Sequence, residues 1–172
     1  MKIIDYNGTP LHLVPHEPDN GYRFYMSRDG TIGLRIAPNG TESLQKAIPT
    51  TRENNSNKTN ANRKQRYWQF RHPWNSDEHI LVSHAVYLAW SGKPIPPDHQ
   101  IHHLNGITTD NRLDNLVCVS KPEHRLYNTV QRILRASGRL ATMTTAEILA
   151  ETRSKILTDP LALAARDIDK YR

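Results

Sequence analysis

The chain has 172 residues, of which 37% are hydrophobic, and it carries a net charge of +6 at pH 7. This length suits one ordinary domain, or a small catalytic core with attached binding segments. The basic charge favours an acidic partner such as nucleic acid, although a solvated positive surface explains charge alone equally well.

Cys118 is the only cysteine, which excludes an internal disulfide and a zinc site built from thiolates. It lies in the apolar run 116–119, so we expect a buried, unreactive thiol. The first residues lack the apolar core of a signal peptide, and no run is long enough to span a membrane. We therefore expect a cytoplasmic protein with no membrane partner.

Residues 1–50 predict an N-terminal β-rich segment, because short apolar runs alternate with Gly and Pro. Residues 22–27 and 31–36 are typical of two strands, and the Asp29-Gly30 pair between them is typical of a hairpin turn. This segment gives no indication of its function.

Residues 51–79 form a second segment, in which Asn and basic residues are mixed with aromatic ones. Such side chains reach phosphates and base edges, and aromatic rings stack on bases. The alternative is a polar linker followed by a strand over residues 67–71. On the first interpretation, the predicted DNA contacts here are Arg63, Lys64, Arg66 and Tyr67.

Residues 80–138 predict the catalytic core. A short strand at 80–82 is followed by a helix over 84–90, with Ser83 as the expected N-cap and Gly92 as the stop. The prolines at 94, 96 and 97 exclude a regular element there.

The pattern that follows predicts strand, loop, strand and helix. The strands cover residues 100–103 and 116–120, and the loop between them is rich in Asp and Asn. Ser120 is the expected N-cap of a helix with Pro122 in its first turn, and Gly138 is the expected stop.

Residues 139–172 predict a C-terminal helical segment. Thr144 and Glu147 have the spacing of a capping box, and Ile148, Leu149, Thr152 and Ile156 would share one side of the helix. A last helix is expected from the Asp159-Pro160 pair.

Three histidines lie close together in the strand, loop, strand and helix pattern. His102 and His103 are neighbours on a strand and must point to opposite sides, so one can face the helix and the other a substrate. His124, in the first turn of that helix, can meet one of the pair. Two imidazoles can bind a divalent metal with open positions, and the third histidine can accept a proton from an attacking water.

Polar residues around these histidines complete the candidate site. Asn115, just before the second strand, can tie the loop together through hydrogen bonds to the backbone. The helix carries His124, Asn128, Gln131 and Arg135 at spacings that place them on one face. The predicted DNA contacts on this helix are Arg125, Gln131, Arg132 and Arg135.

Each residue also fits an ordinary structural role. His102 and His103 can be strand residues, Asn115 a turn residue and His124 an exposed position in the first turn of a helix. It is their combination within one strand, loop, strand and helix pattern that favours an active site.

This pattern resembles the HNH endonuclease family, in its phage and intron-encoded homing branch. The resemblance covers residues 81–128 and rests on the segments 82–90, 102–106, 110–116 and 120–124. It implies an α+β protein whose core is the ββα-metal motif, with the N-terminal β-rich extension and C-terminal helices around it. It also implies that His103 is the general base, that Asn115 orders the loop, and that His102 and His124 bind one divalent metal.

The sequence departs from that branch at both expected metal ligands. The first ligand there is often Asp and the last often Asn, whereas both are His here, as in the bacterial colicin nucleases. The identity of the metal therefore stays open among Mg²⁺, Mn²⁺, Zn²⁺ and Ni²⁺. Asn128 falls where some relatives have a third histidine, so it is a candidate contact to the metal or a phosphate. His84 is interpreted as structural support, and the other histidines, His12, His16, His72, His79 and His99, as ordinary residues.

The leading hypothesis is a metal-dependent endonuclease that cuts double-stranded DNA at a specific site, as a monomer or homodimer without a small-molecule cofactor. One alternative is a non-catalytic DNA-binding protein with a structural metal, but structural zinc sites normally have four protein ligands, and only two strong ones are evident. Another is a metal-independent helix-turn-helix module, which leaves the histidine cluster without a role.

Overall fold

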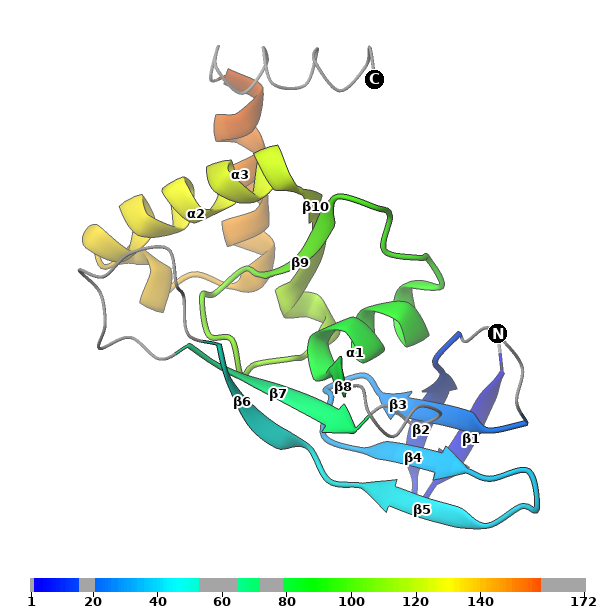
Figure 1. Cartoon of the computed structure of the whole chain (residues 1–172). Helices are drawn as coiled ribbons and strands as arrows, with labels where there is room; N and C mark the ends of the chain where they lie inside the picture. The colour runs from blue at the N-terminus through cyan, green and yellow to red at the C-terminus, as the bar shows by residue number, and fades with distance from the viewer. Residues whose placement is uncertain (1, 16–20, 53–64, 72–78, 159–172) are drawn as a thin grey trace. The chain divides into compact units, whose positions relative to one another are not determined.

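The computed structural model describes residues 2–15, 21–52, 65–71 and 79–158 (Figure 1). The chain forms two compact units. Unit 1 comprises Met1–Pro94 and Thr108–Leu113, and unit 2 comprises Ile95–Ile107 and Asp114–Arg172. Residues 108–113 thus belong to unit 1, although both of their flanking segments belong to unit 2.

In its described residues, unit 1 has two antiparallel sheets and one helix. The five-stranded sheet has its strands in chain order: β1 (Ile3–Tyr6), β2 (Thr9–Leu13), β3 (Arg23–Ser27), β4 (Gly33–Ile36) and β5 (Glu42–Gln45). The three-stranded sheet consists of β6 (Ile48–Arg52), β7 (Gln65–Arg71) and β8 (His79–Leu81). The predicted β-rich segment and the predicted strand at 67–71 are both confirmed.

The expected hairpin is the pair β3–β4, in which Arg23 lies opposite Ile36 and Met26 opposite Gly33. Its turn needs glycine at position 30, which has a φ of +77°. A Cβ at Gly30 would also lie only 2.9 Å from Cγ1 of Val82, so space as well as backbone conformation requires glycine.

Alternating side chains give the five-stranded sheet an apolar surface on each face. Leu11, Tyr25 and Leu34 belong to a buried cluster, against which Tyr6 packs. The intervening residue Phe24 meets Phe70 of β7 edge to face, with ring centroids 5.5 Å apart. Packing on both faces fixes the register of these strands, because a slip of one residue would exchange the two sets.

The helix of unit 1, α1 (Val82–Ser91), follows β8 directly. The prediction that Ser83 is its N-cap was wrong: Leu81 is the N-cap, and no side chain caps the helix. Ser83 is a buried residue of the first turn, because packing of the apolar face of α1, rather than capping, determines where the helix begins. The predicted stop is confirmed, since Gly92 is the C-cap with a φ of +65°.

Residues 108–113 contact unit 1 at the β3–β4 turn. The Leu113 backbone N–H donates to the carbonyl oxygen of Arg28 at 3.0 Å. Asn111 is 6% exposed, and its Cβ would lie 3.0 Å from a Cβ at Gly30. These contacts explain why residues 108–113 belong to unit 1, although the residues on either side of them in the sequence belong to unit 2.

Unit 2 is built on the antiparallel pair of β9 (His99–His103) and β10 (Leu116–Ser120). The short η2 (Leu113–Asn115) precedes β10, and α2 (Lys121–Ala136) follows it and packs on both strands. The chain continues through η3 (Arg139–Ala141) and α3 (Thr145–Thr158). The predicted strand, loop, strand and helix pattern is confirmed. The core of unit 2 contains Leu104, Val119, Tyr127, Val130, Leu134, Leu140 and Ile148.

Both capping predictions in unit 2 are confirmed. Ser120 is the N-cap of α2: its Oγ accepts from the Glu123 N–H, and Glu123 Oε2 accepts from the Ser120 N–H. Thr144 and Glu147 make the same pair of contacts before α3. α2 ends at Ala136, two residues before Gly138, which has a φ of +74°.

Ser120→Ala is expected to lower the free energy of unfolding by about 1 kcal/mol, because it leaves a helical N–H without its acceptor. Urea denaturation would measure the change. Ser120→Asn, which keeps an oxygen acceptor, is the matched control and should lose much less. Equal losses in the two variants would contradict the capping role.

The described helices and strands are those of a mixed α and β protein, which agrees with the expected α+β class. Among residues 2–15, 21–52, 65–71 and 79–158, no helix has both the length and the apolar character needed to cross a bilayer. The last predicted helix, from Asp159, lies outside these ranges, as do Arg63 and Lys64.

Candidate active site

The two adjacent histidines lie at the end of β9, opposite the start of β10. His103 pairs with Leu116 and His102 with Val117. Both histidines are 5% exposed. Because neighbours on a strand point to opposite sides, only one of them can face α2. That residue is His102, since its ring meets side chains from three positions of α2, which are His124, Tyr127 and Gln131.

The rings of His102 and His124 lie close together. Their centroids are 5.1 Å apart and their planes are nearly perpendicular, at 79°. Tyr127, one turn further along α2, stands edge to face with His102 at 5.4 Å. The structure therefore brings together the two histidines expected to bind a metal, one from the strand and one from the helix.

The surroundings keep both of these imidazoles neutral. The pKa of His102 is lowered to about 3, mainly by burial and further by the positive charges that His124 and His103 can carry. Burial also lowers the pKa of His124. A neutral imidazole retains a lone pair on one ring nitrogen, which is the form that binds a metal.

Asn115 closes the loop that follows β9. Its side chain is fully buried, and its Oδ1 accepts from the Asn105 backbone N–H at 2.9 Å. Its Nδ2 donates to Asn105 Oδ1 at 3.0 Å, and that same oxygen accepts from the Ile107 N–H at 2.8 Å. The two asparagines thus fix the chain immediately after His103. Sequence reasoning identified Asn115 but missed its partner Asn105, for which the Asn-Gly turn signal was the available indication.

Two further polar residues of α2 lie beside the histidines. Asn128 is exposed, and its amide nitrogen is 3.2 Å from His124 Nδ1. Gln131, predicted to contact DNA, is instead buried at 9% exposure and hydrogen-bonded to the backbone at the end of β9. Its spacing of seven residues from His124 could have indicated this, because residues seven apart share a helix face.

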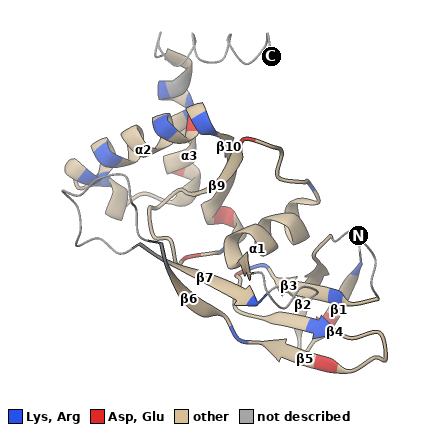
Figure 2. Ribbon diagram, viewed as in Figure 1, with Lys and Arg blue, Asp and Glu red and all other residues tan. Residues whose placement is uncertain are grey.

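Arg125, Arg132 and Arg135 are exposed on α2, where Figure 2 shows basic residues recurring along the helix. Of the other predicted DNA contacts, Arg66 and Tyr67 belong to β7 in unit 1. Of the predicted DNA contacts that the structure describes, those in the same unit as the histidines therefore lie on α2.

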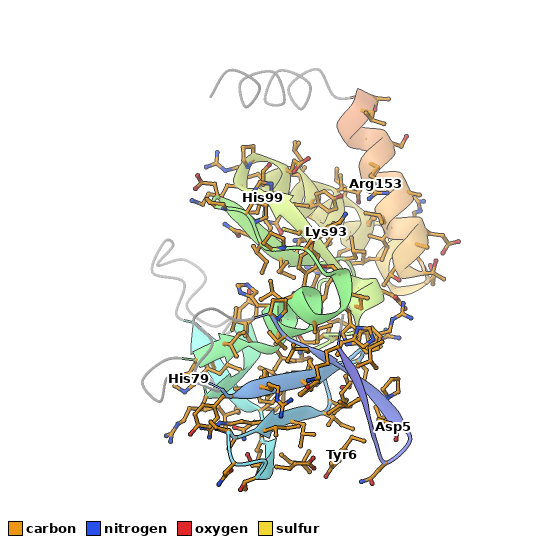
Figure 3. All side chains as sticks on the ribbon, turned by 90° about the vertical axis from the view of Figure 1, so that its right-hand side faces the viewer. Asp5, Tyr6, His79, Lys93, His99 and Arg153 are labelled. Carbon is orange, nitrogen blue, oxygen red and sulfur yellow. The ribbon has the colours of Figure 1, made fainter. Side chains whose placement is uncertain are left out.

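The other described histidines are His12, His79, His84 and His99. His12 stacks on Trp90 within unit 1, with ring centroids 3.6 Å apart. His99 Nδ1 is 3.0 Å from the carbonyl oxygen of Pro97 (Figure 3). His84 is a partly buried residue of α1. In the part of the chain that the structure describes, no group of three or more His, Cys, Asp or Glu side chains is placed to hold a metal ion.

Comparison with known families points to the same segment. The family model of the HNH endonuclease matches residues 81–126. This match runs from the last residue of β8 to the second turn of α2 and includes His102, His103, Asn115 and His124. It supports nuclease activity on DNA for this part of the chain. No curated protein and no solved structure matches the sequence.

Proposed function

We propose that this protein is a metal-dependent endonuclease that hydrolyses phosphodiester bonds in double-stranded DNA at a specific site, as homing endonucleases do. One observation carries the proposal. The segment that matches the HNH endonuclease family is also the segment in which β9 and α2 bring His102 and His124 to 5.1 Å. The roles below are assigned on that basis.

His102 and His124 are the proposed metal ligands, and the pair fits a divalent cation. Two imidazole nitrogens at about 2.0–2.1 Å from one tetrahedral cation place their ring centroids about 5 Å apart. Burial lowers the pKa of both rings and so favours the neutral form that a metal ligand must have. A bound cation would supply Lewis-acid stabilisation of the leaving oxygen. Two protein ligands leave open positions, which suits a catalytic site better than a structural one.

Asn128 is the candidate for a third contact from the protein. With its amide oxygen turned towards His124, it would accept from Nδ1–H and leave the lone pair on Nε2 for a cation. Alternatively, its exposed amide can donate to a phosphate oxygen. Two imidazoles suit Zn²⁺ and Ni²⁺, whereas Mg²⁺ and Mn²⁺ prefer oxygen ligands, which water and phosphate would supply at the open positions.

His103 is the proposed general base. It follows His102 directly in the sequence and points to the opposite side of β9. Its 5% exposure would let it meet an individual water rather than bulk solvent. Asn115 supports this role indirectly, because it fixes the loop that begins at Leu104.

The proposed DNA contacts in unit 2 are the exposed arginines of α2, which are Arg125, Arg132 and Arg135. Guanidinium groups bind phosphate oxygens without reading sequence, so they would supply affinity and orientation. Arg63, Lys64, Arg66 and Tyr67 are proposed to extend the contact along the duplex. A long contact suits a protein that acts at one specific site, as a monomer or a homodimer.

The test is a cleavage assay on a pool of genomic DNA fragments and on supercoiled plasmid. The protein would first be freed of metal with a chelator, and Mg²⁺, Mn²⁺, Ni²⁺ and Zn²⁺ would then be added separately. We expect cleavage with at least one metal and none in chelator. His124→Ala, prepared identically, controls for contaminating nucleases and should be inactive.

Two results would contradict the proposal. Cleavage that persists undiminished in chelator would exclude a metal-dependent mechanism. Binding of duplex DNA without cleavage of any fragment under all four metals would instead support the alternative, a non-catalytic DNA-binding protein with a structural metal.

A further inference from the structure

One buried polar side chain links α2 to the end of β9. The amide nitrogen of Gln131 lies 2.6 Å from the carbonyl oxygen of His103 and 2.9 Å from that of Leu104. It also lies 3.2 Å from Nε2 of His102. Gln131 therefore touches both adjacent histidines, one through its backbone and the other through its ring.

The hydrogens of this amide can be assigned. An amide NH₂ has two hydrogens, and the two carbonyl oxygens can only accept, so both hydrogens point at the backbone. An N–H on Nε2 of His102 would then face the hydrogens of another donor. The contact therefore favours the tautomer of His102 in which Nε2 carries a lone pair and Nδ1 carries the proton.

The same side chain also approaches the loop that follows β9. Gly106 has a φ of +73°, and a Cβ added there would lie 3.2 Å from Gln131 Oε1 and would collide with the guanidinium of Arg135. The loop thus passes close to α2 at a position whose backbone conformation favours glycine. Gln131 is therefore enclosed by β9, the loop and its own helix.

We propose that Gln131 is a positioning residue of the active site, and this inference rests on the proposed nuclease function. It holds the backbone of His103 and Leu104 at a fixed distance from α2, and it selects the tautomer of His102. Because His103 and His124 lie on different elements, this link determines how the general base stands relative to the ligands on the helix. Gln131 acts through its neighbours and does not touch the substrate.

The variants that test this role remove the donors but keep the size of the side chain. Gln131→Glu is nearly isosteric, but its carboxylate would face two carbonyl oxygens. Gln131→Met keeps length and helix propensity and donates nothing. Thr129→Ala, at an exposed position on α2, is the control for substitution on this helix. Ile148→Ala, in the core of unit 2, is the control for a general loss of stability.

The first readout separates catalysis from binding at a temperature where every variant is folded. We expect Gln131→Met to lower the single-turnover cleavage rate at saturating DNA by about 10- to 100-fold, as is usual for residues that orient metal ligands. Its Kd for DNA should change less than about threefold. Thr129→Ala and Ile148→Ala should keep the wild-type rate even though Ile148→Ala is less stable.

The second readout does not depend on activity. In the metal-free protein, ¹⁵N NMR of the His102 ring should show a proton on Nδ1 and none on Nε2. Gln131→Met should add a population with the proton on Nε2. Thr129→Ala should leave the wild-type pattern unchanged.

The outcomes distinguish the two proposals. An unchanged rate together with an unchanged His102 tautomer in Gln131→Met would overturn the positioning role. If Ile148→Ala loses as much of the cleavage rate as Gln131→Met, then Gln131 contributes only to the stability of the protein. If the wild-type protein cuts no DNA, the nuclease proposal fails, and the tautomer measurement still decides whether Gln131 orients His102.

Discussion

His103→Ala is expected to lower the single-turnover rate of DNA cleavage by about 100- to 10,000-fold, the usual contribution of a general base. The variant lacks the imidazole that would accept a proton from the attacking water. His102, His124 and the arginines of α2 are unchanged, so the Kd for DNA should stay close to that of the wild type. Cleavage with enzyme in excess and a gel-shift titration would measure the two quantities.

His99→Ala is the matched control, because His99 lies on the same strand but outside the cluster. It should cut at close to the wild-type rate. Wild-type cleavage by His103→Ala would remove His103 from the mechanism. Joint loss of cleavage and DNA binding would show that the residue supports the fold and not the chemistry.

Asn115→Ala is expected to be the most destabilising change in the site, lowering the free energy of unfolding by about 1–3 kcal/mol. The variant removes the acceptor of the part-buried Asn105 N–H and the donor to Asn105 Oδ1. Cleavage should fall as well, because the loop after His103 loses its closure. Urea denaturation and the single-turnover assay would follow the two effects.

Asn115→Asp separates hydrogen bonding from loss of volume. A carboxylate can still accept from the Asn105 N–H, but its second oxygen would face Asn105 Oδ1, which accepts from Ile107. Protonation would restore a donor at that position. The deficit in unfolding free energy relative to the wild type should therefore be larger at pH 7 than at pH 4. A deficit that is independent of pH would contradict this account.

The local elements around the site could be predicted because each has a signal within a few residues. Ser120 and Glu123 have capping-box spacing, and this places the start of α2 and hence His124. Strand alternation requires that only one of His102 and His103 face α2. Strand alternation could not decide which of the two histidines faces α2, because that depends on the face of the two strands on which α2 packs.

The remaining features depend on contacts between residues far apart in the sequence. Gln131 is buried by its contacts with residues 102–104, which lie 27–29 residues earlier in the chain. Ser83 has a typical capping residue type, yet packing of α1 places it inside the helix. The assignment of residues 108–113 to unit 1 rests on the bond from Leu113 to Arg28, which no local pattern indicates.

The assignment of residues 108–113 to unit 1 determines how the segment that matches the nuclease family can be isolated. A fragment beginning at Ile95 would retain residues 108–113 but lose Arg28 and Gly30, their partners at the β3–β4 turn. The stretch that connects the two strands of unit 2 would then have no surface to rest on. A minimal enzyme would therefore require either the whole of unit 1 or a short designed turn between Ile107 and Asp114. The family match, which begins at residue 81, does not mark a boundary at which the protein can be cut.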